Sequence, residues 1–329
     1  MDKRQWLKTV EAFFREKNRA WLSGEAESML HDLAGTPADC HSWQEVRAMR
    51  DARLHRGDIR YRKTKTSLQI HAANWLPDRE LAVVEATEHV RFYYEQGTGL
   101  QHEERSIRHR LTLQPVNGEW RVLQDDTLRE NGDATFRPDG EAEAVTALAA
   151  VDVFDGAPHV ETRDARGRYD RVRAYKYAEL WWNGYNPVFQ QMKGNDCTNY
   201  VSQVLYAGGM PLVRGGSRSS GWWYDIGGKH NWSYSWAVAH SLRLALTRVL
   251  HAQEVSDPRQ LKIGDVICYD WDGDGRWQHN TVVVDFDGGG QPLVNAHTVN
   301  SHRRFWTYRD SYAWTPKTKY SFFHIPDQF

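Results

Sequence analysis

The stretch "NDCTNYVSQVLYAGG", residues 195–209, predicts a short amphipathic helix with a cysteine in its first turn. The apolar residues lie on one helical face, at positions 197, 201, 204 and 205. Asn195 and Asp196 are favourable helix-start residues, and Gly208–Gly209 predicts the stop. Cys197 is therefore expected where unpaired backbone N–H groups and the helix dipole favour a thiolate, with a pKa well below that of a free thiol.

A second interpretation is that Cys197 only fills the core, because free cysteine is among the most buried residue types. The other cysteines offer no clear competitor for chemistry. Cys268 in "GDVICYD" is predicted to be an inert strand residue, and Cys40 lies in a predicted loop without an activating partner. Three cysteines cannot form a disulfide framework, which fits a reducing compartment.

The composition is that of an ordinary soluble globular protein. The chain has 329 residues, enough for two domains, with 40% hydrophobic and 26% charged residues. A net charge of −1 gives no electrostatic basis for binding nucleic acid. No apolar run is long enough to predict membrane insertion, and the first residues lack a secretory apolar core. We therefore expect a cytoplasmic protein; a signal removed from the sequence would instead place it outside the cell or at the cell wall.

Residues 1–130 predict a helix over 3–22 followed by a curled antiparallel meander, with an Asn117–Gly118 hairpin turn. The strand-like stretches are "DIRYRKTKTSLQIHAANW", "ELAVVEATEHVRFYYEQG" and "ERSIRHRLTLQPVNGEWRVLQDDTL". This order resembles the cone-shaped nuclear-transport-factor-two-like (SnoaL-like) domain. No acid–base constellation is evident in it. Residues 131–168 predict a linker or crossover, so the remainder, 169–329, is expected to fold without the first domain.

The second half carries a candidate partner for the cysteine. "LKIGDVICYD", "QHNTVVVDFD" and "LVNAHT" predict three strands separated by turns. His279 begins the second of these strands. Asn295 and His297, two residues apart, share one face of the third. We expect one of these two residues to accept a hydrogen bond from the His279 ring and to set its tautomer.

Several motifs together resemble the putative amidase domain family of bacteria over residues 169–325. They are "YNPVFQQMKGNDCTNYVSQVLYAGGMPL", "WWYD", "YSW", "LKIGDVICYDWDGDGRWQHNTVVV" and "LVNAHT". The family belongs with papain-like cysteine hydrolases of the NlpC and CHAP type, which cut amide bonds in peptidoglycan and related peptides. The resemblance implies Cys197 as nucleophile and His279 as general base. It implies Asn295 as the third member, with His297 as a rival.

Further residues are candidates for substrate or oxyanion contacts. Gln191, six residues before the cysteine, matches the position of an oxyanion-hole glutamine in papain relatives. Asp196 is expected to act mainly as the helix cap. Trp223 and Trp236, together with Trp222, either line a substrate groove or pack beneath the cysteine helix.

The segment "DWDGDG" matches the first positions of a calcium-binding EF-hand loop at Asp270, Asp272, Asp274 and Gly275. The twelfth position is Thr281 rather than a bidentate glutamate, and Asp and Gly also favour hairpin turns. We therefore predict a turn, and expect no metal and no cofactor.

Taken together, the sequence predicts an α+β protein with an N-terminal cone-like domain and a papain-like cysteine hydrolase domain. The expected function is cysteine-dependent hydrolysis of amide bonds in a peptide or peptidoglycan fragment. Two alternatives stay open: a non-catalytic peptide- or glycan-binding module on the same fold, and an acyltransferase that uses the same nucleophile. The sequence does not identify the substrate, the role of the first domain or the oligomeric state.

Overall fold

The first part of the chain is a helix pair followed by a meander of long strands. The structure, a computed structural model, describes residues 3–23, 41–56, 59–127, 167–226 and 231–329. The helices are α1 (Lys3–Ser23) and α2 (His41–Arg56). The strands are β1 (Ile59–Leu76), β2 (Leu81–Gln96), β3 (Gly99–Val116) and β4 (Glu119–Thr127), with the short 3-10 helix η3 (Pro77–Arg79) between the first two.

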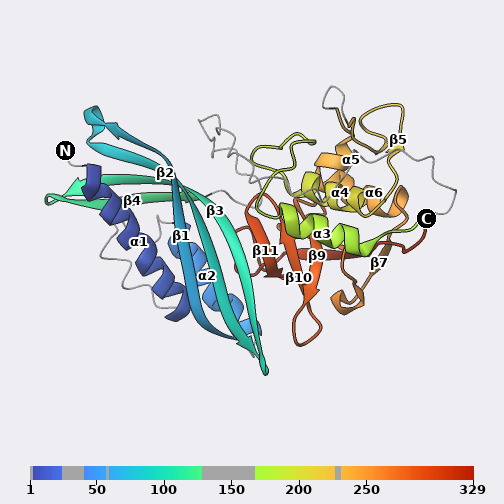
Figure 1. Ribbon diagram of the computed structural model, residues 1–329, viewed down its shortest axis with the longest axis horizontal. Coiled ribbons are helices and arrows are strands. Elements are labelled where there is room, and N and C mark those ends of the chain that lie inside the picture. Colours follow the sequence, from blue (N-terminus) through green and yellow to red (C-terminus); the bar gives the residue numbers. More distant parts are fainter. Residues whose placement is uncertain (1–2, 24–40, 57–58, 128–166, 227–230) are drawn as a thin grey trace.

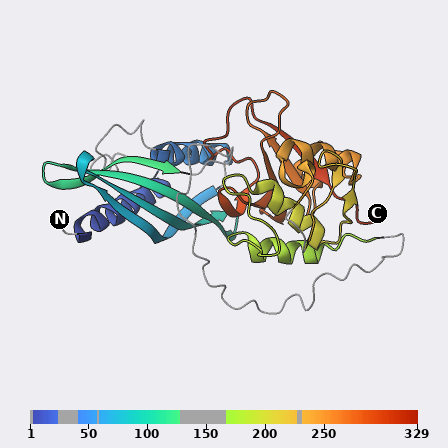
Figure 2. The same ribbon diagram turned by 90° about the horizontal axis from the view of Figure 1, so that it is seen from above.

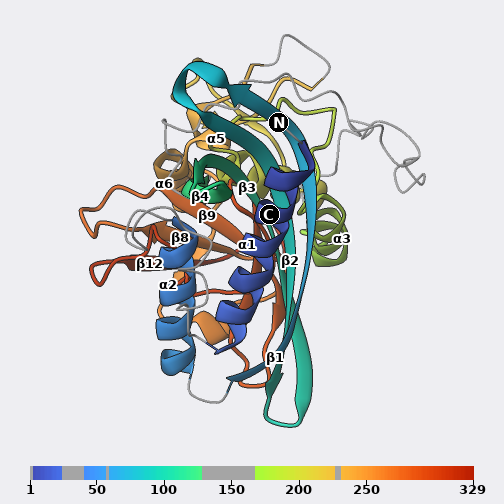
Figure 3. The same cartoon turned by 90° about the vertical axis from the view of Figure 1, so that its left-hand side faces the viewer.

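The predicted helix, strands and hairpin turn of this part are confirmed. Asn117 and Gly118 both have positive φ, 53° and 84°, as a tight hairpin turn requires. α1 and α2 pack against one side of the meander (Figure 3). The core between them contains Val10, Phe13 and Phe14 of α1 and alternate residues of β2 such as Val90 and Phe92.

The second part has four helices and a set of shorter strands in the described residues. The helices are α3 (Arg171–Trp181), α4 (Cys197–Ala207), α5 (Tyr234–Ala237) and α6 (Ala239–Arg248). The main strands are β8 (Val266–Asp270), β9 (His279–Phe286), β10 (Pro292–Ala296), β11 (Asn300–Phe305) and β12 (Lys319–His324). The short elements are β5 (Val213–Arg214), β6 (Gly221–Trp222), β7 (Gln253–Val255) and η4 (Pro258–Gln260).

Strands β8 and β9 are buried on both faces. Val266, Cys268, Val282 and Val284 face a core shared with α3, α4 and α6. The intervening residues, Ile267, Tyr269 and Val283 among them, face a second core that is rich in aromatic side chains. Because neighbouring residues on a strand point to opposite faces, each residue of β9 is committed to one of these two cores.

The strands of both parts join in one antiparallel sheet among the described residues. Its order is β1-β2-β3-β11-β10-β9-β8-β12-β7, with β4 also paired to β3. β3 is long enough that one edge serves two partners: β4 pairs with residues 109–116, and β11 pairs with residues 104–106. We call the pairing of β3 with β11 the seam between the two parts. Figures 1 and 2 show the two parts side by side there. The fold is thus α+β.

The predicted domain boundaries stay a prediction. Most of the expected linker, 131–168, lies outside the described residues, as does Cys40. Beyond the β3–β11 pairing, side chains cross the seam: Gln96 donates to Asp287 at 2.9 Å, and Arg105 forms an ion pair with Asp310. None of the described helices is long and apolar enough to cross a membrane.

Candidate active site

Cys197 is the first residue of α4, as predicted from the sequence, and its side chain is fully buried. Around its sulfur lie the backbone N–H of Asn280 and the hydroxyls of Thr198 and Thr298, with Thr198 Oγ1 3.7 Å from Sγ. Asn195 Oδ1 lies 3.7 Å from Sγ. The helix start therefore does surround the sulfur with donors.

The protonation of Cys197 differs from the sequence-based expectation. Burial raises the pKa of the Cys197 thiol, and the three donors offset this only in part, while the neighbouring Asp196 carboxylate adds to the rise. The predicted lowering of the pKa is therefore wrong for this conformation. The reason is that a helix N-terminus favours a thiolate most where water also reaches it, and here the sulfur is sealed in the core.

His297 is the histidine that lies at the start of α4. Its Nδ1 is 2.6 Å from Asp196 Oδ2, and its Nε2 is 2.7 Å from the backbone oxygen of Trp181. The ring stacks on Tyr200 with centroids 4.1 Å apart. Both ring nitrogens thus face oxygen acceptors.

His279 lies elsewhere. Its ring packs among Tyr269, Trp271 and Tyr308, with centroids 5.5, 5.7 and 5.5 Å away. The next residue, Asn280, points toward α4 and donates to Thr198 Oγ1 at 3.0 Å. Strand alternation therefore places the His279 ring on the face of β9 opposite the cysteine helix. The expected contact between Cys197 and His279 is not found, and the catalytic role of His279 stays a prediction.

Asn295 shares a sheet face with His297, as predicted, but it does not orient His279. Its amide nitrogen donates to the backbone oxygen of Ala178 at 3.4 Å and to Glu179 Oε1 at 3.2 Å. Its oxygen accepts from the backbone N–H of Arg303 at 2.8 Å. Asn295 therefore ties β10 to α3 and β11.

Asp196 is the residue before α4, as expected, but its side chain binds other partners in place of a helix cap. Its Oδ1 accepts from the backbone N–H of Met192 at 2.7 Å and from Asn199 at 2.9 Å, and its Oδ2 faces His297. No side-chain cap bond to α4 is formed. Gln191 is exposed and hydrogen-bonds to Tyr185, so it stays a candidate without a demonstrated role.

Trp222 and Trp236 pack in the core beneath the cysteine helix, the second of the two interpretations. Trp236 is fully buried and donates to Asn199 Oδ1 at 2.8 Å. Trp222 is also fully buried, and Trp223 is almost so, donating to the backbone oxygen of Ser220. The turn at Asp270 is likewise confirmed, because its carboxylate accepts the backbone N–H groups of residues 273 and 275 at 2.8 Å each.

Sequence reasoning missed the residues that line the sulfur. Thr298 has a φ of 84°, which is rare for a β-branched residue and marks a strained backbone beside Cys197. Asn280 and Thr198 complete the surroundings. The sequence signal for Asn280 was present, since it is a polar residue at the start of an otherwise apolar strand.

A buried ionic network in the first part was also missed. Lys17 lies 2.9 Å from Glu45 and 3.0 Å from Glu88, and His109 contacts Glu88 and Asp125 at 3.3 and 2.8 Å. This part therefore holds a buried cluster of charged and titratable side chains that sequence reasoning did not anticipate. The strand alternation in the sequence could have indicated this network. Glu88 and His109 occupy strand positions whose neighbours two residues away are apolar, which places both side chains on the buried face.

Comparison with known proteins finds a family similar to the second part. Residues 168–323 match the family described as "Putative amidase domain". The match supports an amidase-like hydrolase.

The relatives themselves are uncharacterized. Protein YhbB of Bacillus subtilis (strain 168) is 43% identical over 211 residues, covering 62% of this chain and 65% of its own length. Protein YjcM of the same organism is 29% identical over 142 residues, covering 40% of this chain and 31% of its own. The chain thus spans less than two thirds of either relative. Among solved structures, the intermembrane space region of chloroplast protein ARC6 overlaps 39% of this chain and 96% of its own. It does so with a TM-score of 0.29 and 17% identity, too low to define a shared fold.

Proposed function

We propose that the protein is a papain-like cysteine hydrolase that cuts amide bonds in a peptide or peptidoglycan fragment, with Cys197 as its nucleophile. The observation that carries the proposal is the position of Cys197 at the start of α4, among hydrogen-bond donors and next to the Asp196–His297 pair. The family match over residues 168–323 supports amide chemistry. A substrate of peptide type follows from that chemistry.

In the mechanism we propose, His297 takes the thiol proton of Cys197 and Asp196 holds the ring. Because both ring nitrogens face acceptors, the ring must first leave the Trp181 carbonyl so that one nitrogen can accept the thiol proton. The thiolate then attacks the amide carbonyl carbon and forms a C–S bond. Backbone N–H groups of the first turn of α4 stabilise the oxyanion, at roughly 3 kcal/mol for each donor.

The second half of the cycle returns the protein to its starting state. The imidazolium gives its proton to the leaving amine as the C–N bond breaks, and an acyl group remains on the sulfur. Water, activated by the neutral ring, then attacks this thioester and releases the acid. An amine in place of water would complete an acyl transfer by the same steps.

One observation favours a different function. Cys197 is fully buried and its thiol pKa is raised, and the His279 ring lies in an aromatic core. A non-catalytic module that binds peptide or glycan requires neither a thiolate nor a base. We therefore keep recognition without turnover as the second candidate.

The deciding experiment uses the full chain, peptidoglycan fragments and a peptide library. The hydrolase predicts release of new amino groups and an acyl adduct on Cys197, detected by intact mass. Cys197→Ala should abolish both, whereas Cys268→Ala, a change at a second buried cysteine, should keep both. An added amine distinguishes transfer from hydrolysis. Binding of a fragment without turnover or adduct would refute the hydrolase and support the recognition module.

A further inference from the structure

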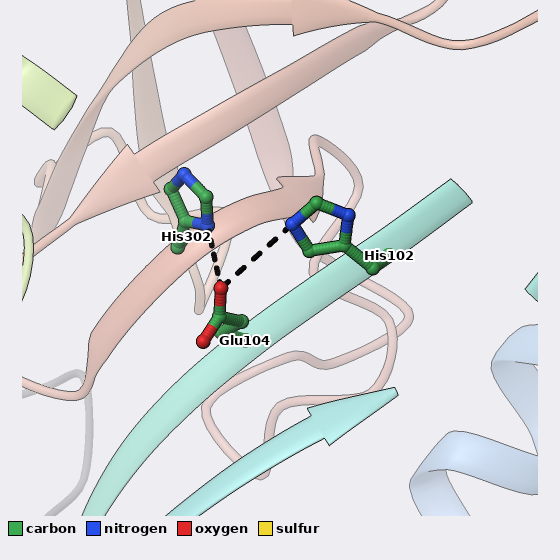
Figure 4. Close-up of side chains that lie close together, drawn as sticks. All are labelled: His102, Glu104 and His302. Carbon is green, nitrogen blue, oxygen red and sulfur yellow. Dashed lines mark ion pairs between the residues drawn. The ribbon is translucent and has the colours of Figure 1, made fainter. Parts of the chain in front are cut away.

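The seam between β3 and β11 brings together two histidines and a glutamate. Glu104 of β3 lies directly opposite His302 of β11 in the antiparallel register. His102 lies two residues before Glu104 and so shares its face of the sheet. Figure 4 shows the two rings converging on the Glu104 carboxylate from the two strands. The donor atoms of all three side chains lie within 4.8 Å of one another.

These atoms lie further apart than the partners of a direct charge-assisted hydrogen bond. Glu104 Oε1 lies 3.4 Å from His302 Nδ1 and 3.7 Å from His102 Nε2. A direct charge-assisted hydrogen bond would be about 2.8 Å long. Two ligands of a tetrahedral zinc ion, each bonded at about 2.1 Å, are about 3.4 Å apart. One carboxylate oxygen is thus held at metal-bridged distances from two imidazole nitrogens.

The surroundings orient the His302 ring for coordination. Its Nε2 faces both oxygens of Glu179, at 3.2 and 3.1 Å, and a carboxylate can only accept, so Nε2 carries the proton. Its Nδ1 is buried, forms no hydrogen bond of normal geometry, and points at Glu104 Oε1. A carboxylate behind a ligating histidine is the usual outer partner in zinc sites.

Two further contacts hold the side chains of Glu104 and His302 in place. Arg91 binds Glu104 Oε2 at 2.8 Å, which leaves Oε1 as the single free ligand oxygen. Trp182 stacks on the His302 ring at 5.1 Å and limits its rotation. His102, with 38% of its side chain exposed, gives an ion and a water ligand access from solvent.

We propose that His102, Glu104 and His302 form a binding site for a Zn²⁺-type transition metal ion that joins the two parts of the chain. Two imidazoles and a single carboxylate oxygen favour zinc over magnesium or calcium, which prefer oxygen ligands. Because β3 supplies two ligands and β11 the third, the ion lies across the seam. The proposal is independent of the reaction at Cys197.

The test is titration of the full chain with Zn²⁺ after dialysis against a chelator. We expect one ion per chain by calorimetry, and a higher Tm with zinc. Co²⁺ as a probe should give the visible absorption of a tetrahedral site without thiolate-to-cobalt charge transfer, which excludes binding at the cysteines. His102→Ala, at an exposed position, and Glu104→Gln should each weaken binding by more than about tenfold, and Glu179→Gln by about tenfold or more.

The matched control is His71→Ala. His71 lies on β1 of the same sheet, and its ring Nε2 hydrogen-bonds to Thr87. This variant should bind zinc as the unaltered chain does. The proposal is overturned if the unaltered chain takes up no stoichiometric zinc, which would leave His302 as an ion-paired side chain between two glutamates. It is also overturned if both His102→Ala and Glu104→Gln bind zinc with unchanged affinity.

Discussion

The Nδ1 atom of His297 lies 2.6 Å from Oδ2 of Asp196, so the end of β10 is tied to the residue that precedes the cysteine. Asp196 in turn holds the loop before α4 through the backbone N–H of Met192. One carboxylate therefore positions both the helix start and the imidazole.

Asp196→Asn should lower kcat by more than about tenfold, because an amide cannot serve both as acceptor for His297 and as acceptor for Met192. Steady-state kinetics with the substrate found for the full chain measure the effect. Asp170→Asn, which changes the cap of α3, is the control and should leave kcat within about threefold. Equal losses in the two variants would mean that Asp196 acts only through stability.

The two histidines should respond differently to substitution. His297→Ala should remove nearly all turnover, since it removes the ring beside Asp196. His279→Phe should keep kcat within about threefold, because its ring packs among aromatic side chains where phenylalanine fits. Turnover and Tm of both variants are measured together. Loss of turnover in His279→Phe, with the Tm kept, would return the base role to His279.

Alkylation of Cys197 should be slow near neutral pH and should rise as the pH increases, because burial raises its thiol pKa and lowers the thiolate fraction. Iodoacetamide labelling followed by mass mapping measures each cysteine separately. Rapid labelling of Cys197 at mildly acidic pH would contradict this and would show an open, thiolate-bearing state in solution.

The buried network predicts a stability optimum on the acid side of neutrality. Burial opposes a charge on His109, but Asp125 and Glu88 outweigh it and raise its pKa to about 9. Burial likewise opposes a charge on Glu88, but Lys17 and His109 lower its pKa to about 2. The His109 contribution is complete below its ordinary value of about 6.5 and is lost as the pH rises through 9. The Glu88 contribution is complete above about 4.5 and is lost as the pH falls toward 2.

Urea unfolding at a series of pH values tests this balance. The free energy of unfolding should be greatest between about pH 4.5 and 6.5 and should fall on both sides. His109→Gln should flatten the alkaline decline, whereas His55→Gln, at an exposed position of α2, should not. If the stability of His109→Gln falls at alkaline pH as much as that of the unaltered chain, the decline is caused by other groups.

A fragment beginning near residue 150 should be less stable than the sequence alone suggests. Removing β3 uncovers the edge of β11 at residues 300–302, and an open strand edge promotes association. Size-exclusion chromatography and thermal unfolding of the fragment measure both effects. A monomeric fragment with an undiminished Tm would show that the second part folds independently, as first expected from the linker.

The sequence predicted the position of Cys197, the strands and the turns, because each depends on local patterns. It could not predict which face of β9 meets α4. The run from Thr281 to Val284 is buried on both sides, so its alternation does not indicate whether the side chain of His279 or that of Asn280 faces the cysteine helix. The pairing of β11 with β3 joins residues about two hundred positions apart and leaves no local signal.

The strained residue Thr298 connects the β3–β11 pairing to the surroundings of Cys197. Thr298 contacts the sulfur of Cys197, and only Val299 separates it from Asn300, where β11 begins its pairing with Ser106. The Thr298 hydroxyl beside the Cys197 sulfur thus lies next to a strand that pairs with both halves of the sheet. If the proposed hydrolysis at Cys197 holds, the smallest active unit is therefore expected to be longer than the matched region at residues 168–323 and to include β3. Substitutions along β3, which lies outside residues 168–323, should therefore change the reactivity of the Cys197 sulfur.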